Sequence, residues 1–206
     1  TVLDTTDPTT IQAIERWVPL EKTLFIVASK SGSTAESVAF GEYFYAKLKE
    51  IKGEKAGENF VVITDPKSPL LEKAQVRKYL RAFVNYPDIG GRYSALSYFG
   101  LVPAALYGLD VEELLLRALR MMHACQSSVE AGESPGLVLG AALGELAVRG
   151  RDKITLLLPQ ALLPLGMWVE QLLAESTGKE GKGLFPVAGE PVGHPSVYGD
   201  DRGFIF

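Results

Sequence analysis

The sequence predicts an α/β fold built on a parallel sheet, because two short apolar runs flank a segment of helical periodicity. Residues 24–28 and 60–63 are continuously apolar, which is typical of strands that are covered on both faces. Between them, apolar or small residues recur at helical spacing from Thr34 to Lys52, and Gly53 supplies a stop signal. A strand, a helix and a strand of these lengths predict a right-handed βαβ unit.

Further elements are expected in the same alternating order along the chain. A helix near Pro69–Lys78 precedes a third strand at Arg81–Val84, and a later pattern predicts a strand at Ile154–Leu158 and a helix at Pro164–Glu175. The helical region between these parts is expected to hold three helices, at residues 94–107, 111–128 and 137–148. The closing stretch is rich in glycine and proline and predicts an ordered tail or loop. Thr1–Asp4 resembles the end of a strand.

Composition excludes several classes of function. The formal net charge of -4 leaves no basic surface for nucleic acid as a partner. The single cysteine, Cys125, cannot form an internal disulfide, which fits a reducing cytosol. No apolar run reaches the roughly 18 to 20 residues that a membrane-spanning helix needs, and the N-terminus lacks the pattern of a signal peptide. We therefore expect a cytoplasmic protein that does not contact a membrane.

A hydroxyl-rich loop marks the junction between the first predicted strand and its helix. Ser29, Ser31, Ser33 and Thr34 lie within six residues that also contain Gly32. In open α/β sheets, ligands bind where parallel strands end, and a helix N-terminus offers unpaired N–H groups. Because the spacing of the nucleotide P-loop is absent, the loop predicts a site for the phosphate monoester of a small molecule.

A structural explanation competes with this one. Ser33 directly precedes the predicted helix, and Glu36 lies three residues after Ser33. The two side chains could therefore form a capping box. Capping by Ser33 would leave the hydroxyls of Ser29, Ser31 and Thr34 unexplained.

Three motifs, in order along the chain, resemble the glucose-6-phosphate isomerase family, whose members are built from sugar isomerase domains. They are Leu24–Glu36, Gly90–Ser94, and Glu175–Lys179 followed by Gly189–Pro191. The last third of the chain, through Val197–Arg202, most resembles the isomerase part of fused transaldolase–isomerase enzymes. The resemblance implies a three-layer α/β/α sandwich with a parallel sheet, of the flavodoxin-like kind.

The resemblance also implies roles for individual residues. Five residues would lie around the substrate phosphate, namely Ser29, Lys30, Ser31, Thr34 and Ser37. Arg92 would lie beside the reacting end of the sugar, and Glu175 would be the catalytic base. The family's ring-opening histidine would correspond to His194, although a surface turn is an alternative explanation for that residue. His123, in the predicted helix at 111–128, is expected to be structural.

These roles fit the chemistry of the family, which interconverts glucose 6-phosphate and fructose 6-phosphate without a metal or an organic cofactor. Moving the carbonyl from C1 to C2 transfers one proton through a cis-enediolate, and one carboxylate can act as base and then as acid. An arginine stays protonated and can stabilise the enediolate oxygens with a rigid fork of donors. The resemblance further implies a homodimer.

The resemblance divides the chain into two regions. Residues 1–130 would form a nearly complete first sugar isomerase domain that binds phosphate, and 137–206 would form part of a second domain that carries Glu175. The family's opening glycine-rich segment and its C-terminal lysine find no counterpart in the sequence, so we expect a chain truncated at both ends.

Two other functions stay open at this point. The chain could be a phosphosugar-binding module without catalysis, which would need the hydroxyl loop but neither Arg92 nor Glu175. It could also be the isomerase portion of a bifunctional enzyme that carries transaldolase as well, although no residue here encodes that second activity.

Overall fold

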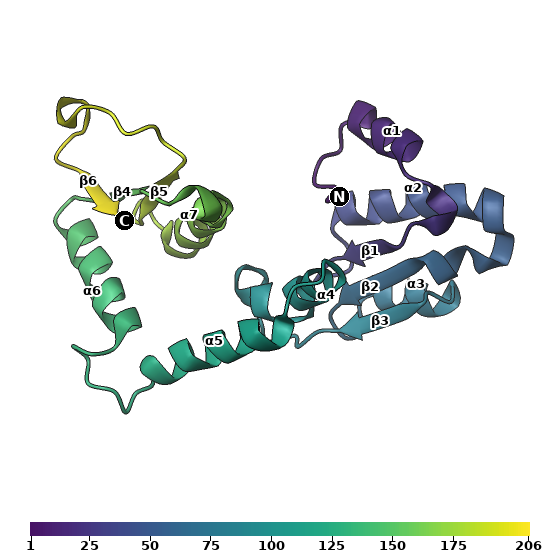
Figure 1. The fold of residues 1–206 in the computed structure, drawn as a ribbon, viewed down its shortest axis with the longest axis horizontal. Coiled ribbons are helices and arrows are strands. Elements are labelled where there is room, and N and C mark those ends of the chain that lie inside the picture. Colours follow the sequence, from purple (N-terminus) through teal and green to yellow (C-terminus); the bar gives the residue numbers. More distant parts are fainter. The chain divides into compact units, whose positions relative to one another are not determined.

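Two short parallel sheets organise the chain, one in each of the two units found among the 206 residues that the computed structural model describes. The first unit is Thr1–Val111 and the second is Glu112–Phe206. Figure 1 shows the order of the elements along the chain. The division falls before the region 130–137 in which the sequence places a domain boundary. The assignment of two sugar isomerase domains to 1–130 and 137–206 stays a prediction.

The sheet of the first unit confirms the predicted strands. Its three strands run parallel in the order β1-β2-β3. They are β1 (Phe25–Ala28), β2 (Phe60–Thr64) and β3 (Arg81–Val84). Every residue of the central strand β2 is buried, as a continuous apolar run predicts for a strand covered on both faces.

The two crossover helices cover one face of this sheet. They are α2 (Ala35–Lys52) and α3 (Pro69–Val76), close to the predicted ranges. Glu42 of α2 accepts a hydrogen bond of 2.7 Å from the guanidinium of Arg77, which follows α3. Right-handed crossovers that advance in one direction across a sheet place their helices on the same face, and this ion pair joins the two helices there.

A third helix, α4 (Tyr98–Leu106), covers the other face. The ring of Tyr98 lies 5.5 Å from that of Phe83, centroid to centroid. Phe83 is paired with Ile63 in the register of the sheet and faces away from α2 and α3. The short helix η3 (Gly91–Leu96) precedes α4, so the predicted helix at 94–107 is divided at Ser97. Helices therefore lie on both faces of the sheet, which confirms the predicted three-layer arrangement.

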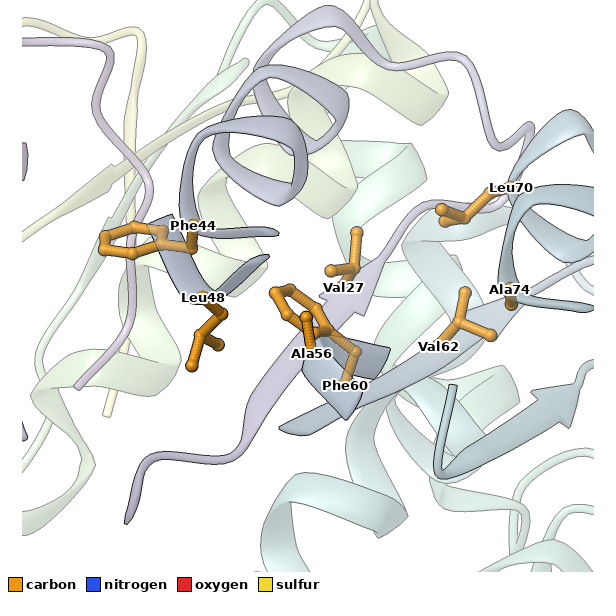
Figure 2. Packing of buried hydrophobic residues seen from close by; sticks show 8 residues of the cluster. All are labelled: Val27, Phe44, Leu48, Ala56, Phe60, Val62, Leu70 and Ala74. Carbon is orange, nitrogen blue, oxygen red and sulfur yellow. The ribbon is translucent and has the colours of Figure 1, made fainter. Parts of the chain in front are cut away.

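The core of the first unit lies between β1, β2 and the two crossover helices. Figure 2 shows its eight buried hydrophobic residues: Val27, Phe44, Leu48, Ala56, Phe60, Val62, Leu70 and Ala74. Phe25 stacks on Phe44 and on Phe60, with ring centroids 4.9 and 5.1 Å apart. The helix α1 (Pro8–Trp17), which the sequence analysis did not predict, packs against this cluster through Ile11 and Ile14.

The second unit is also built on a three-stranded parallel sheet, with a smaller core. Its parallel sheet has the order β5-β4-β6, with β4 (Lys153–Leu156), β5 (Phe185–Ala188) and β6 (Arg202–Ile205). Helices α6 (Pro135–Val148) and α7 (Leu163–Thr177) precede and follow β4. Three buried residues form its core, namely Leu143, Ile154 and Leu156.

Two expectations about the ends of the chain are wrong. The closing stretch contains β5 and β6, and is therefore more than a loop. Pro186 lies within β5, where its missing N–H is tolerated because β5 is an edge strand of its sheet. Thr1–Asp4 forms no strand, although Leu3 packs against the core of the first unit.

The remaining elements connect these parts. Helix α5 (Val111–Ala124) ends four residues earlier than the prediction of 111–128. Four short helices complete the list, namely η1 (Leu20–Lys22), η2 (Gly53–Asn59), η4 (Gln160–Leu162) and η5 (Pro195–Val197). None of the helices combines the length and the apolar character that crossing a bilayer requires.

Candidate active site

The hydroxyl-rich loop lies at the carboxyl edge of the first sheet, between β1 and α2. The ladder of the sheet continues into it, because the N–H of Ser29 donates to the carbonyl of Ile63 over 3.0 Å. The N–H of Asp65 in turn donates to the carbonyl of Lys30 over 3.1 Å. The start of the loop is thereby fixed to the buried central strand.

The hydroxyls of this loop form a network of two hydrogen-bonded pairs, one of which contains Ser29, a residue that is 4% exposed. Ser29 Oγ lies 2.8 Å from Thr34 Oγ1 and accepts a hydrogen bond of 3.1 Å from the N–H of Gly32. Ser31 Oγ lies 2.9 Å from Ser33 Oγ. Ser31, Ser33 and Thr34 are exposed, so the network holds a row of hydroxyls in fixed positions on the surface.

The first turn of α2 is not capped by a side chain. The N-cap residue is Thr34, and its hydroxyl makes no capping hydrogen bond, because it is engaged with Ser29. The alternative prediction of a capping box from Ser33 and Glu36 is therefore wrong. The first N–H groups of an 18-residue helix have no side-chain acceptor, and they point outward with the positive end of the helix dipole. Hydroxyls and uncapped N–H groups together suit an anion.

Ser37 lies one turn into α2. Its hydroxyl donates a hydrogen bond of 3.2 Å to the carbonyl of Ala28, the last residue of β1. Ser37 is half-buried, and its oxygen retains acceptor capacity. The bond ties the start of the helix to the end of the strand, so the two sides of the loop move as one body.

Gly32 is required where it stands in the loop. Its φ is +69°, and a Cβ there would lie 2.8 Å from Ser68 Cβ and 3.0 Å from Leu70 Cβ. Ser68 caps α3 by accepting from the N–H of Leu71, and it also accepts a bond of 2.7 Å from Thr64. The hydroxyl-rich loop therefore packs directly on the start of the next crossover helix, with no room for a side chain at Gly32.

Two acceptors hold the ammonium group of Lys30. It forms an ion pair with Asp65, the residue that follows β2, and it donates a hydrogen bond of 2.9 Å to the carbonyl of Pro87. Asp65 and Pro87 were not identified from the sequence. The available signal for Asp65 was its position just beyond the end of the predicted buried strand at 60–63.

Arg92 belongs to η3, on the connection that follows β3. This connection leaves the same carboxyl edge of the sheet as the phosphate loop, and Arg92 is half-buried. The next helix is held close to η3, because a Cβ at Gly100 would lie 2.0 Å from the carbonyl oxygen of Ala95. The first unit therefore brings the loop and the arginine segment to one edge of its sheet.

Glu175 lies at the end of α7 in the second unit and is exposed. The helix stops at Gly178, and the chain reverses at once through a tight turn in which Lys179 pairs with Lys182. The two residues between them, Glu180 and Gly181, both have positive φ, at 54° and 74°, as the hairpin turns of type I′ require. The turn leaves the carboxylate at the rim of its unit.

His194 also lies in the second unit, between β5 and β6, and it is exposed. Its Nδ1 accepts from the N–H of Ser196 at 3.3 Å and lies 2.8 Å from Ser196 Oγ, so the ring caps η5. The bond leaves Nε2 as the nitrogen that carries the proton when the ring is neutral. This placement agrees with a surface turn, and a role in ring opening stays a prediction. His123, expected to be structural, is exposed in the last turn of α5.

The candidate residues thus fall into two groups. The phosphate loop and Arg92 belong to Thr1–Val111, whereas Glu175 and His194 belong to Glu112–Phe206. Across the 206 described residues, no group of three or more His, Cys, Asp or Glu side chains is arranged to hold a metal ion.

Similarity to known proteins shows the family of the chain. The family model described as "Phosphoglucose isomerase" matches residues 1–184. The chain belongs to the phosphoglucose isomerase family. Among its relatives, the glucose-6-phosphate isomerase of Rubrobacter xylanophilus is 40% identical over 184 residues, which cover 87% of the chain and 42% of the relative. A glucose-6-phosphate isomerase of Thermus thermophilus is 37% identical over 177 residues, covering 86% and 42% respectively.

Solved structures agree with this assignment. A hypothetical protein from Thermus thermophilus superposes with a TM-score of 0.82 at 34% identity, covering 90% of the chain and 45% of that protein. A glucose-6-phosphate isomerase from Chlamydia trachomatis gives a TM-score of 0.71 at 28% identity, covering 87% and 35%. The fold is therefore that of the phosphoglucose isomerase family. The chain spans about two fifths of the length of the Rubrobacter and Thermus relatives.

Proposed function

We propose that the chain supplies the phosphate-binding and proton-transfer residues of an isomerase that interconverts glucose 6-phosphate and fructose 6-phosphate. The observation that carries this proposal is the Ser29–Thr34 loop, whose fixed hydroxyls surround the uncapped start of α2. Membership of a family whose relatives are named glucose-6-phosphate isomerase supports the same substrate class.

In this proposal the phosphate acts as a handle for the sugar. The hydroxyls of Ser31 and Thr34 and the first N–H groups of α2 bind its oxygens, with Ser29, Lys30 and Ser37 forming the surrounding scaffold. Several fixed donors around a dianion hold the sugar in one orientation, which lowers the entropic cost of reaching the transition state. The phosphate site therefore contributes to rate as well as to affinity.

The reaction itself needs one base and one fixed positive charge. Glu175 takes the proton from C2 of the aldose and later returns it to C1. The electron pair of the broken C–H bond forms the C1–C2 double bond of the cis-enediolate, the carbonyl pair moves to O1, and the hydroxyl proton passes from O2 to O1. Arg92 stabilises the negative charge that develops on the enediolate oxygens. The exposed position of Glu175 at a helix end supports this role, because its carboxylate is accessible to a ligand.

A phosphosugar-binding module without catalysis is the competing function. Such a module needs the hydroxyl loop alone, whereas the resemblance to the family implies roles for both Arg92 and Glu175, which supports the enzyme. A bifunctional protein with transaldolase activity is less favoured, since the Rubrobacter and Thermus relatives are named for the isomerase alone. The proposal also includes a cytoplasmic homodimer and the opening of the sugar ring by His194.

A coupled assay of fructose 6-phosphate isomerisation tests the proposal with two matched variants. Glu175→Gln keeps the shape of the side chain but removes the base, and should lower kcat by about 10²- to 10⁴-fold. Glu170→Gln makes the same change on the same helix and should leave kcat unchanged. Full activity of Glu175→Gln would exclude the proposed base. If no variant isomerises the sugar while fructose 6-phosphate still raises the unfolding temperature, the chain binds the sugar phosphate without turning it over, as a binding module or a part of a longer isomerase would.

A further inference from the structure

Three polar residues form a row across the carboxyl edge of the first sheet. The register pairs Ala28 with Ile63 and Thr64 with Val84, so Lys30, Asp65 and Asn85 follow the ends of β1, β2 and β3 at matching positions. The N–H groups of the last two continue the ladder, to Lys30 O at 3.1 Å and to Thr64 O at 2.8 Å.

All three side chains of this row leave the same face of the sheet. Side chains alternate between the faces of a strand, and the parity of the register places the row on the face covered by α4, opposite α2 and α3. Phe83, two residues before Asn85, contacts α4 from this face. Asn85 is 2% exposed, so the end of the row that follows β3 is buried.

Lys30 joins the row to the segment that carries Arg92. Its ammonium contacts the carboxylate of Asp65, which follows β2, and the carbonyl of Pro87, which lies shortly after β3. The Lys30 side chain is one third exposed and that of Asp65 is 15% exposed, so water screens this pair less than it screens a pair on an open surface.

The chain from Pro87 to Arg92 is short and internally bonded. Ile89 N–H donates to Tyr86 O over 3.3 Å, and Tyr93 N–H donates to Gly90 O over 3.0 Å. Because of these two consecutive turns, few backbone dihedral angles are free to change between the Pro87 carbonyl, which Lys30 contacts, and Arg92. A displacement of Pro87 is therefore transmitted to Arg92.

We propose that Lys30 is a positioning residue for Arg92, acting through Asp65 and the Pro87 carbonyl, and that its ammonium does not bind the substrate phosphate. The inference rests on the proposed function for the role of Arg92. Lys30 then couples the position of the loop to that of Arg92, because its backbone belongs to the loop and its side chain contacts the segment that carries Arg92. Asp65 neutralises the ammonium and directs it away from the start of α2.

The experiment measures two quantities in the full chain, namely hydrogen exchange of the amides of residues 88–94 and the affinity for inorganic phosphate. Lys30→Met removes the charge at similar length, and Asp65→Asn removes the acceptor charge at similar shape. Lys55→Met removes one charge from an exposed lysine of η2 and serves as the control. The double variant Lys30→Met/Asp65→Asn tests whether the two side chains act as one unit.

Both single variants should accelerate exchange at 88–94 by about tenfold or more and leave the phosphate affinity within about twofold of the wild type. The double variant should be no faster than the faster single variant. In the isomerase assay, kcat should fall by about 10- to 100-fold with the KM for fructose 6-phosphate almost unchanged, because only the reacting end of the sugar is displaced.

Two results would overturn the inference. In the first, Lys30→Met weakens phosphate binding by more than about tenfold without changing the exchange at 88–94, which would make the ammonium a direct phosphate ligand. In the second, neither variant changes the exchange. Because exchange and phosphate affinity need no turnover, a chain that fails to isomerise fructose 6-phosphate would refute the proposed function and still decide the role of Lys30.

Discussion

The phosphate loop and the turn that follows Glu175 are supported in different ways. The loop starts from a sheet whose central strand is entirely buried, and its hub, Ser29, is nearly buried itself. Glu175 is exposed, and the chain around it is shaped by a hairpin turn between Lys179 and Lys182. In the first region the core of the unit sets the site, whereas in the second a local turn does. Stability and ligand binding should therefore be coupled in the loop and separable at Glu175.

The hydrophobic core of the first unit is also larger than that of the second. Eight buried hydrophobic residues form the cluster of the first unit (Figure 2), against three in the second. A larger cluster excludes more apolar surface from water and makes each truncation within it more costly.

The largest expected effect comes from truncating the two cores. Phe44 is 1% exposed and stacks on Phe25. Phe44→Ala should lower the free energy of unfolding by about 3 to 5 kcal/mol, because burial is lost and a cavity remains. Leu143 is 8% exposed in the smaller cluster, so Leu143→Ala should cost about 2 kcal/mol. Exchange of the β2 and β4 amides reports the two units separately. A greater loss of unfolding free energy in Leu143→Ala than in Phe44→Ala would contradict the view that the first core contributes more to stability.

The next effect concerns Gly32, where backbone and packing act together. Gly32→Ala should destabilise the first unit by roughly 2 to 4 kcal/mol, from positive φ and from the close approach of Ser68. It should also weaken the binding of inorganic phosphate, because the loop must move.

Gly108 provides the matched control for this change. It has a φ of +80° in the same unit, and a Cβ there would meet nothing within 4 Å. Gly108→Ala should therefore cost only about 1 to 2 kcal/mol and leave phosphate binding intact. Equal losses of stability and of phosphate affinity in the two variants would show that the loop does not depend on its contact with α3.

The smallest effect concerns the ion pair between the crossover helices. Burial raises the pKa of Glu42, but hydrogen bonds from Arg77 and Lys73 outweigh burial and bring that pKa below its ordinary value of 4.5. A lowered carboxyl pKa contributes stability above pH 4.5, and this contribution is lost as the pH falls through the folded-state pKa. Because the Glu42 side chain is 41% exposed, solvent limits the contribution to about 1 kcal/mol or less.

Glu42→Gln should therefore destabilise the first unit at pH 7, and this loss should become smaller when the pH is lowered to 3, as measured by urea unfolding. In the second unit the pKa of Asp201 is lowered chiefly by its hydrogen bond from Lys153, and this pair lies at the surface. Asp201→Asn should leave the stability unchanged at both pH values. A loss in Glu42→Gln that is the same at both pH values would exclude the ion pair as its cause.

Much of the first unit could be predicted from the sequence, since its elements have strong periodic or continuous apolar patterns. The strands at Phe25–Ala28, Phe60–Thr64 and Arg81–Val84 are short runs with clear boundaries, and the helix between the first two ends at a glycine. The helix at Pro8–Trp17 was overlooked, although Asp7 caps it and Pro8 occupies its first position, a pair that signals a helix start.

The second unit was harder to predict because its last strands are defined by pairing. Four-residue segments such as Phe185–Ala188 and Arg202–Ile205 have too little pattern of their own, and Pro186 argues against a strand unless the strand is at an edge. The sequence likewise identified the hydroxyls of the loop, yet it could not tell whether Thr34 would cap the helix or bind Ser29. That choice depends on the position of β1 relative to α2, which is a property of the folded sheet.

The most direct test of the central claim is a titration of the chain with fructose 6-phosphate, followed by backbone amide chemical shifts. The claim is that the loop between β1 and α2 holds the phosphate of a hexose 6-phosphate. The largest shifts should fall on the amides of residues 30–37, inorganic phosphate should reproduce them, and Thr34→Val should weaken both. Shifts that leave residues 30–37 unchanged while the sugar phosphate binds elsewhere would contradict the claim.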